Sequence, residues 1–310
     1  MSKSAVFGSF VVDLMARSGH MPRPGETVRG SLFRMGPGGK GFNQCVAAHK
    51  AGADVTMITK LGRDSFADVA TDTMRALGMP QDHLLFSEDA VTGAALIMVD
   101  DSTGQNEIVV VPGACDTITP QEVAGAEDIL RTSDYALLQL EVNQDANETA
   151  AALAKRLGCR VILNPAPYAK ISDAFLSGVY MITPNEVEAE ALTGISITDI
   201  DAAAAAAACF FSKGVQHVII TLGARGVFLS SGGRGEIIPA FPVHAVDTTG
   251  AGDAFNGGLL AALSEGMTID RAVHFASGLA ALSVQRLGTT PSMPTRTEID
   301  AFLASNDAKK

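Results

Sequence analysis

The sequence predicts an α/β protein whose mainly parallel sheet has helices on both faces. Three observations carry this prediction. Short apolar segments alternate with helical patterns along most of the chain, which is typical of a parallel sheet. Two turn-rich, strand-like segments, at about 14–35 and 92–112, interrupt the alternation. A glycine-rich stretch at 247–258 (DTTGAGDAFNGG) joins an apolar segment to an apolar helix pattern.

The first half of the chain opens with a predicted buried strand over 5–12. A strand at 55–60 and a helix at 65–77 follow, the helix capped by Asp64 or Ser65. Segments 94–99 and 107–111 have the pattern of a hairpin with a polar turn. We expect this hairpin and the segment at 14–35 to form one small sheet, a lid over the functional site.

The second half of the chain continues the alternation without a linker, charge block or repeat. We therefore expect one domain over 1–310, with the lid segments inserted in it. The predicted strands lie at 136–140, 160–163, 179–182, 218–221 and 227–230. The predicted helices lie at about 120–131, 146–157, 186–192, 199–212, 254–264 and 269–286.

The composition limits the possible partners. The 310 residues include 23 Lys and Arg against 34 Asp and Glu, for a net charge of −11. Because this charge repels polyanions, we expect neither nucleic acid nor a membrane as partner. The four cysteines lack any paired spacing, no leader pattern is present, and the longest apolar run, at 202–211, is too short to cross a membrane. We therefore expect a cytoplasmic protein with small-molecule ligands.

The stretch at 247–258 has the form of an anion-binding turn. A helix that begins there directs the backbone N–H groups of Gly250, Ala251 and Gly252 outward, where anions bind. Asp253 follows at once, although a carboxylate would repel a phosphate. It suits a general base that takes a proton from a hydroxyl while the N–H groups stabilise a transferring phosphoryl group. The alternative interpretation is an acidic N-cap, with a pair of glycines that lets the helix pack closely.

A second glycine-rich motif, at 36–44 (GPGGKGFNQ), has the spacing of a dinucleotide-binding turn. No buried strand precedes it and no acidic residue follows at the expected distance, which argues against an NAD-dependent oxidoreductase. The P-loop pattern fails too, because no lysine follows the last glycine. What remains is a tight turn that carries Lys40 and Asn43 to a helix start, where they and the Gly39 N–H can bind polyol oxygens. A close-packed turn with a solvated lysine is the alternative.

Further polar residues follow predicted strands, where open α/β sheets place ligand-binding groups. Asp13, Glu141 and Asn164 each lie at or just after such an end. Asn185 and Glu188 fit a hydrated Mg²⁺ near phosphates, although their spacing equally fits a capping box. The turn at 221–226 suits a nucleotide, and a plain β-turn is the alternative.

With both glycine-rich motifs at this separation, the chain resembles the ribokinase-like sugar kinase family (the phosphofructokinase-B type) over nearly its whole length. Further shared stretches are PGET at 24–27, NPAP at 164–167, TPNE at 183–186 and TLG at 221–223. The resemblance implies transfer of the γ-phosphoryl group of ATP to the 5-hydroxyl of D-ribose, giving ribose 5-phosphate. The alternatives are 2-deoxyribose, another sugar or a nucleoside. It also implies Mg²⁺, K⁺ and a homodimer paired through the lid.

The resemblance also implies roles for particular residues. Catalysis is implied for Asp253 with the N–H groups of Gly250, Ala251 and Gly252. Sugar contacts are implied at Asp13, Gly39, Lys40, Asn43, Glu141 and Asp253. Nucleotide contacts are implied at Asn185, Thr221, Gly223, Ala224, Arg225, Gly226, Gly252 and Ser277, with Glu188 linked to Mg²⁺ and phosphate. A monovalent-cation site, held largely by backbone carbonyls, is implied at Asp247, Thr249, Ser283, Arg286, Gly288 and Ser292.

One departure concerns the sugar. The family usually carries Asn where this chain has Val11, and related 2-deoxyribose kinases have an apolar residue there. Val cannot make the hydrogen bond that Asn makes with the sugar, so the identity of the pentose is uncertain at this point. The residues implied in phosphoryl transfer are unaffected. A non-catalytic sugar-binding regulator is the rival from another class. It would be expected to lack Asp253 or the Asn185 and Glu188 pair, and all three are present.

Overall fold

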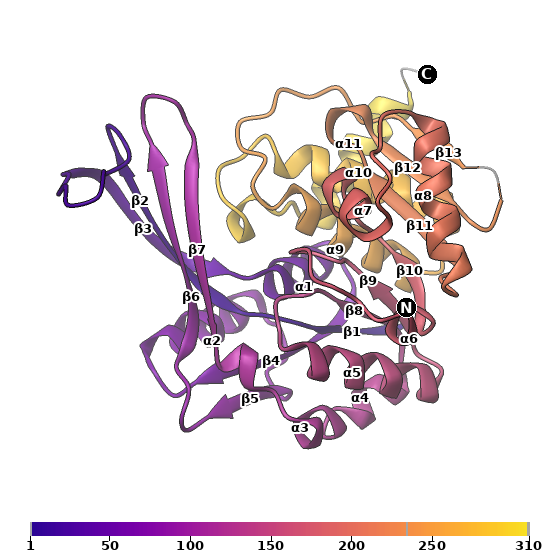
Figure 1. Ribbon diagram of the computed structural model, residues 1–310, viewed down its shortest axis with the longest axis horizontal. Coiled ribbons are helices and arrows are strands. Elements are labelled where there is room, and N and C mark those ends of the chain that lie inside the picture. The colour runs from indigo at the N-terminus through magenta and orange to yellow at the C-terminus, as the bar shows by residue number, and fades with distance from the viewer. Residues whose placement is uncertain (1, 234, 309–310) are drawn as a thin grey trace.

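The structure, a computed structural model, describes residues 2–233 and 235–308. Figure 1 shows a large sheet with helices on both sides and a smaller sheet that projects from it. The large sheet has nine strands in the order β13-β12-β11-β10-β9-β8-β1-β4-β5, all parallel except at β12 and β13. They are β1 (Lys3–Phe7), β4 (Asp54–Gly62), β5 (Leu84–Ser87), β8 (Ser133–Leu138), β9 (Arg160–Leu163), β10 (Val179–Ile182), β11 (His217–Thr221), β12 (Val227–Ser230) and β13 (Glu236–Ile238).

The helices form a layer on each face because successive residues of a buried strand point to opposite sides. Val6 of β1 packs into one hydrophobic cluster, while Ala5 and Phe7 pack into the other. The Val6 side is covered by α1 (Lys40–Lys50), α2 (Ser65–Leu77), α9 (Ala251–Ser264), α10 (Ile269–Ser283) and α11 (Arg296–Asp307). The opposite side is covered by α3 (Pro120–Ala124), α4 (Glu127–Thr132), α5 (Gln144–Leu157), α6 (Asp173–Leu176), α7 (Glu186–Thr193) and α8 (Ile200–Ser212).

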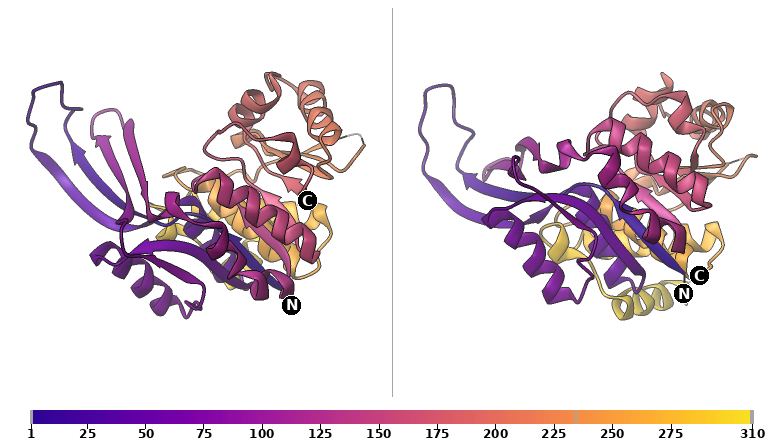
Figure 2. Two further views of the ribbon diagram at one scale, coloured as in Figure 1. Left: turned by 60° about the horizontal axis from the view of Figure 1, so that its bottom comes forward. Right: turned by 90° about the horizontal axis from the view of Figure 1, so that it is seen from below.

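The smaller sheet, the lid, consists of the two segments that were predicted to pair. Its strands are β2 (Val11–Ser18), β3 (Gly30–Gly38), β6 (Thr92–Asp100) and β7 (Asn106–Gly113), in the order β3-β2-β6-β7. The middle pair, β2 and β6, is parallel, and both outer pairs are antiparallel. Both views of Figure 2 show the lid extending away from the helix-covered sheet.

Local sequence signals account for several elements. The predicted helix at 65–77 has the predicted bounds, and the Asp64 side chain caps it by accepting from the N–H groups of Phe66 and Ala67 at 3.0 Å. The predicted helix at 120–131 is instead two helices, α3 and α4, separated by Gly125 and Ala126. The helix predicted to reach 286 ends at Ser283. The four-residue elements β5 and α6 were not predicted.

The prediction of one strand over 5–12 was wrong. β1 ends at Phe7 and β2 begins at Val11, so the chain leaves the large sheet here and enters the lid. The first turn of α1 packs against this break: the Phe42 N–H donates to the Ser9 carbonyl at 3.0 Å. A Cβ atom on Gly41 would lie 2.7 Å from the Ser9 nitrogen, so the approach requires glycine. Asp13 therefore lies within the lid and not at the end of a large-sheet strand.

Candidate active site

The N-terminus of α9 forms the centre of the site. Gly250 caps the helix with a φ of 75°, and Asp253 in the first turn is buried, with 6% of its surface exposed. The prediction of three free N–H groups needs one correction: the Ala251 N–H donates to the Thr248 carbonyl at 3.2 Å. The N–H groups of Gly250 and Gly252 make no hydrogen bond within the described chain. A Cβ atom on Gly252 would meet nothing within 4 Å, so the space beside it is open.

Two side-chain amides of α1 hold the Asp253 carboxylate. Asn43 Nδ2 donates to Asp253 Oδ2 at 3.1 Å, and Gln44 Nε2 donates to Asp253 Oδ1 at 2.9 Å. The hydroxyl of Thr290 donates to Asn43 Oδ1 at 3.0 Å. Asn43, a predicted sugar contact, therefore lies beside Asp253, the predicted base. Gln44 and Thr290 were not singled out from the sequence.

The predicted sugar-binding residues converge on the same place. Glu141 Oε2 accepts from the Lys40 backbone N–H at 2.8 Å and from the Ser9 hydroxyl at 2.6 Å. Gly39 precedes Lys40 as the N-cap of α1, with a φ of 90°. Asp13 lies close enough to Glu141 and Asp253 for their charges to act on it. The lid, the strand end after β8 and the start of α1 thus meet at one cluster.

The electrostatics of this cluster are dominated by burial. Burial raises the pKa of Asp253, while the Lys40 charge and the hydrogen bonds from Gln44 and Asn43 oppose the shift. Burial, followed by the charges of Glu141 and Asp253, also raises the pKa of Asp13 to about 6. For Lys40, burial favours the neutral form, but the carboxylates around it prevail and hold its pKa above the usual value. Lys40 is therefore a half-buried cation among acids.

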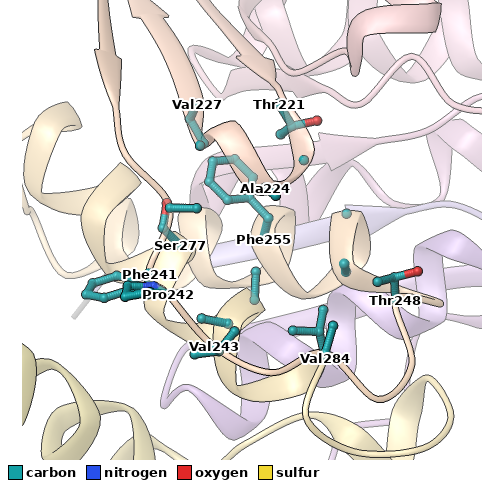
Figure 3. A pocket seen from close by; sticks show the side chains of 18 residues that line it. Thr221, Ala224, Val227, Phe241, Pro242, Val243, Thr248, Phe255, Ser277 and Val284 are labelled. Carbon is teal, nitrogen blue, oxygen red and sulfur yellow. The ribbon is translucent and has the colours of Figure 1, made fainter.

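A pocket of about 470 Å³ opens next to the N-terminus of α9 (Figure 3). One wall is apolar and comes from residues 240–245 and from α10 and the residue after it. The Ser277 hydroxyl is buried and has no hydrogen-bond partner within the described chain, as expected of a group that contacts a ligand. The predicted residues in the lining are Thr221, Gly223, Ala224, Gly226, Ala251, Gly252 and Ser277. The lining residues that were not predicted include Phe241, Val243, Phe255, Ala280 and Val284.

Two other predicted nucleotide contacts lie outside the lining. The Arg225 guanidinium pairs with Glu186 of α7. Asn185 and Glu188 form the capping box that was weighed as their alternative, with Asn185 N–H to Glu188 Oε2 at 2.9 Å and Glu188 N–H to Asn185 Oδ1 at 2.8 Å. Burial raises the pKa of Glu188, and Lys40 and Asp253 both act on it. Glu188 therefore lies close enough to the site for its charges to act on it, even while it caps α7.

The residues of the predicted cation site come from two loops that Asp247 joins. Asp247 accepts from the Thr249 N–H on one oxygen and from the Gly288 N–H on the other, each at 2.9 Å. The hydroxyls of Ser283 and Ser292 donate to carbonyls in their own turns, and Arg286 pairs with Glu298. Within the described residues, no group of three His, Cys, Asp or Glu side chains could hold a metal ion.

Comparison with known proteins finds relatives along nearly the whole chain. The family model described as pfkB family carbohydrate kinase matches residues 1–296. A ribokinase of Haemophilus influenzae is 42% identical over 298 residues, which cover 96% of this chain and 97% of the relative. A deoxyribokinase of Salmonella typhi is 34% identical over 304 residues, which cover 98% of this chain and 99% of the relative.

A solved structure gives the same result. The structure of Arabidopsis thaliana ribokinase complexed with ribose and ATP matches with a TM-score of 0.91 at 29% identity, over 98% of this chain and 99% of that one. The large sheet, the lid and both glycine-rich turns lie within the matched length. The chain therefore belongs to the pfkB family of carbohydrate kinases.

Proposed function

We propose that this protein is an ATP-dependent kinase that phosphorylates the 5-hydroxyl of D-ribose. The observation that carries the proposal is the position of Asp253. Its buried carboxylate contacts Asn43 in the sugar-site cluster, while Gly252, the residue before it, lines the 470 Å³ pocket. A carboxylate at this junction can meet a sugar hydroxyl on one side and a phosphoryl group on the other. The ribokinase relatives and the complex with ribose and ATP support this assignment.

In the proposed reaction, each side of the site has its own part. The apolar wall of the pocket suits adenine, and the open space beside Gly252 suits the phosphates of ATP. Lys40, Asn43 and Asp13 hold the sugar. Asp253 takes the proton of the sugar 5-hydroxyl. The oxygen of that hydroxyl bonds to the γ-phosphorus of ATP, and the bond between this phosphorus and the leaving ADP breaks. The N–H groups of Gly250 and Gly252 stabilise the charge on the transferring group.

We propose two ions as companions of ATP. Mg²⁺ would lie near Glu188, whose second carboxylate oxygen makes no hydrogen bond within the described chain, and when bound it would neutralise phosphate charge. K⁺ would lie between the loops that Asp247 joins, bound by backbone carbonyls, and when bound it would hold the turn at Gly250. The bridge from Asp247 to Gly288 supports this, because it brings the two loops together.

The lid supports a proposed homodimer. Residues paired across strands share a face, so Phe33, Met35, Leu96 and Val109 lie on one face of the lid. They are 65%, 54%, 51% and 61% exposed, respectively, which is unusual for such large apolar side chains. We infer that the same face of a second copy covers them. We also propose that the enzyme works in the cytoplasm, because all four cysteines are free and ATP is available there.

The sugar has a second candidate, 2-deoxyribose. Val11 and Asp13 lie two residues apart on β2, so their side chains point to the same face. Val11 is 4% exposed and covers Gly93 of the neighbouring strand, where a Cβ atom would lie 2.9 Å from Val11 Cγ1. An isopropyl group at this place favours a sugar carbon without a hydroxyl.

A coupled assay of ADP release tests the proposed function across ribose, 2-deoxyribose, fructose, tagatose and nucleosides. We expect the two pentoses to be phosphorylated with the highest kcat/KM. The position of the phosphate is read by NMR of the product, and we expect it at the 5-carbon. Phosphorylation of the anomeric hydroxyl, or of fructose or nucleosides in preference to pentoses, would contradict the proposal.

A further inference from the structure

A network of buried amides connects Asp253 to the protein interior. Gln44 Nε2 donates both to Asp253 Oδ1, at 2.9 Å, and to Asn164 Oδ1, at 3.0 Å. On its other side, Gln44 Oε1 accepts from Gln139 Nε2 at 2.6 Å. Gln44 and Gln139 are fully buried and Asn164 is 6% exposed. Buried amides are normally hydrogen-bonded, and the NH₂ group and the oxygen of Gln44 both have partners, so these contacts determine how Gln44 lies. The other oxygen of this group, Gln139 Oε1, is buried without a partner among the described residues.

The network leaves Gln44 one orientation. Asn164 Nδ2 donates to the Thr183 carbonyl at 3.0 Å, so its oxygen faces Gln44. Gln139 presents its NH₂ group to the Gln44 oxygen. A flipped Gln44 would direct its oxygen at the Asp253 carboxylate and its NH₂ at another NH₂ group. Gln44 is therefore held as a donor toward Asp253.

The same network reaches the backbone of the α9 turn. The Thr183 hydroxyl donates to Asn256 Oδ1 at 2.6 Å, and Asn256 Nδ2 donates to the Gly252 carbonyl at 2.8 Å. The helices α1 and α9 are in backbone contact nearby, since a Cβ atom on Gly257 would lie 2.5 Å from the Gln44 carbonyl oxygen. The distance between Gln44 and Asp253 is thus set by both the helix packing and the hydrogen bonds.

We propose that Gln44 is a positioning residue for phosphoryl transfer: held by Gln139 and Asn164, its amide fixes the Asp253 carboxylate in the orientation that accepts the proton of the sugar hydroxyl. The inference rests on the proposed function, because it takes Asp253 as the base. Gln44 acts only through Asp253.

A pH profile separates this role from a purely structural one. The charged groups that face Asp253 are Lys40 on α1, Glu141 after β8, Asp13 on β2 and Glu188 on α7. Replacing Gln44 changes none of them. A hydrogen bond to the carboxylate favours its ionised form, so loss of the Gln44 donor raises the pKa of Asp253.

The test uses Gln44→Met, which keeps the volume and removes the donors. We expect kcat to fall by roughly 10- to 100-fold, as for a misplaced catalytic group, with KM for ATP within about twofold. The acid limb of the kcat–pH profile should move up by about 1–2 units, the equivalent of one hydrogen bond to a charged group. The matched control is Asn147→Leu, which removes a buried amide of α5 that donates to the Gln139 carbonyl. It should leave the acid limb in place.

A double variant completes the test. In an Asp253→Asn background, Gln44→Met should change kcat by less than about twofold, because effects through one group do not add. Two results would overturn the inference, provided that Asp253→Asn alone shows the fall in kcat expected for loss of a base. One is a further tenfold fall in kcat in the double variant, and the other is an acid limb that does not move in Gln44→Met. Near-native kcat in Asp253→Asn would instead refute the proposed base itself. If Gln44→Met does not fold, Gln139→Met should give a smaller shift in the same direction, and no shift would overturn the inference.

Discussion

The Asp13 carboxylate occupies the space beside Gly38 of the neighbouring strand: a Cβ atom on Gly38 would lie 2.2 Å from Asp13 Oδ1. Because Gly38 has no side chain, the Asp13 carboxylate of the lid can pack close to the start of α1. Asp13 is thereby partly buried near two other carboxylates, Glu141 and Asp253. The lid therefore contributes a carboxylate to the proposed sugar site.

This burial predicts an unusual pH dependence of stability. Burial, followed by the charges of Glu141 and Asp253, raises the pKa of Asp13 from 3.8 to about 6. The folded protein therefore binds this proton more tightly than the unfolded chain does, so the Asp13 contribution to stability is lost as the pH rises through about 4 to 6. Asp13→Asn, which cannot ionise, should be more stable than the wild type at pH 7 by up to about 3 kcal/mol and equal to it near pH 4.

Urea unfolding of both sugar-free proteins at several pH values checks this prediction. The difference in unfolding free energy should grow with pH across the window, while the variant loses affinity for the sugar. A variant that is less stable than the wild type at pH 7 would show that the Asp13 charge is well compensated in the fold.

Val11 predicts the choice of sugar. A ribose hydroxyl left unpaired against its isopropyl group would cost about 1–3 kcal/mol, or roughly 5- to 150-fold in discrimination. We therefore expect 2-deoxyribose to compete well with ribose, and Val11→Asn to shift the kcat/KM ratio toward ribose. Competition assays with the two sugars measure both effects. A strong ribose preference that Val11→Asn leaves unchanged would show that Val11 does not contact the sugar.

The Asp247 bridge predicts activation by K⁺. An ion held between the two loops would fix the turn at Gly250, so kcat in K⁺ should exceed kcat in Na⁺ by roughly fivefold or more, a typical coupling between sites. Asp247→Asn should weaken this response. Assays in the chloride salts of K⁺, Na⁺ and tetramethylammonium test it at constant ionic strength. Equal rates in all three would remove the ion from the account.

If the apolar face of the lid forms the dimer interface, a charged side chain placed on that face should dissociate the dimer. Val109→Lys places a charge among Phe33, Met35 and Leu96 and should convert the dimer to a monomer in sedimentation velocity. Val187→Lys is the matched control, because Val187 is 74% exposed on α7, outside the lid. It should leave the dimer intact. A wild-type monomer at micromolar concentrations would contradict the proposed interface.

Much of the fold could be predicted because the alternation of strands and helices is a local signal. The lid was predicted because its segments break that alternation. The split of the first strand was missed, although Gly8 and Ser9 interrupt the apolar run, because Phe7 and Phe10 on either side of them are both buried. The break depends on Gly41 packing against Ser9, a contact between residues distant in the chain. The strand β5 has four residues and lies at the edge of the large sheet beside β4, and so short a segment carries little sequence pattern.

The site was predictable where glycines and acids form motifs, and less so elsewhere. Asp253 and Lys40 lie in such motifs. Gln44 is also in one, but nothing in the spacing shows that its amide contacts a carboxylate more than 200 residues away. For Arg225, the motif placed the residue beside the pocket, while the acid on α7 decides where its side chain points. The apolar stretch at 241–246 was a usable signal for the pocket wall, since it directly precedes the anion-binding turn.

The central claim is that Asp253 is the general base, and Asp253→Asn tests it most directly. The carboxamide keeps the size of the side chain, so thermal unfolding and ATP binding should stay close to those of the wild type. Because the variant cannot accept the proton of the hydroxyl, kcat with ribose should fall by roughly 10²- to 10⁴-fold. A well-folded variant that binds ATP and turns over ribose at a near-native kcat would contradict the claim.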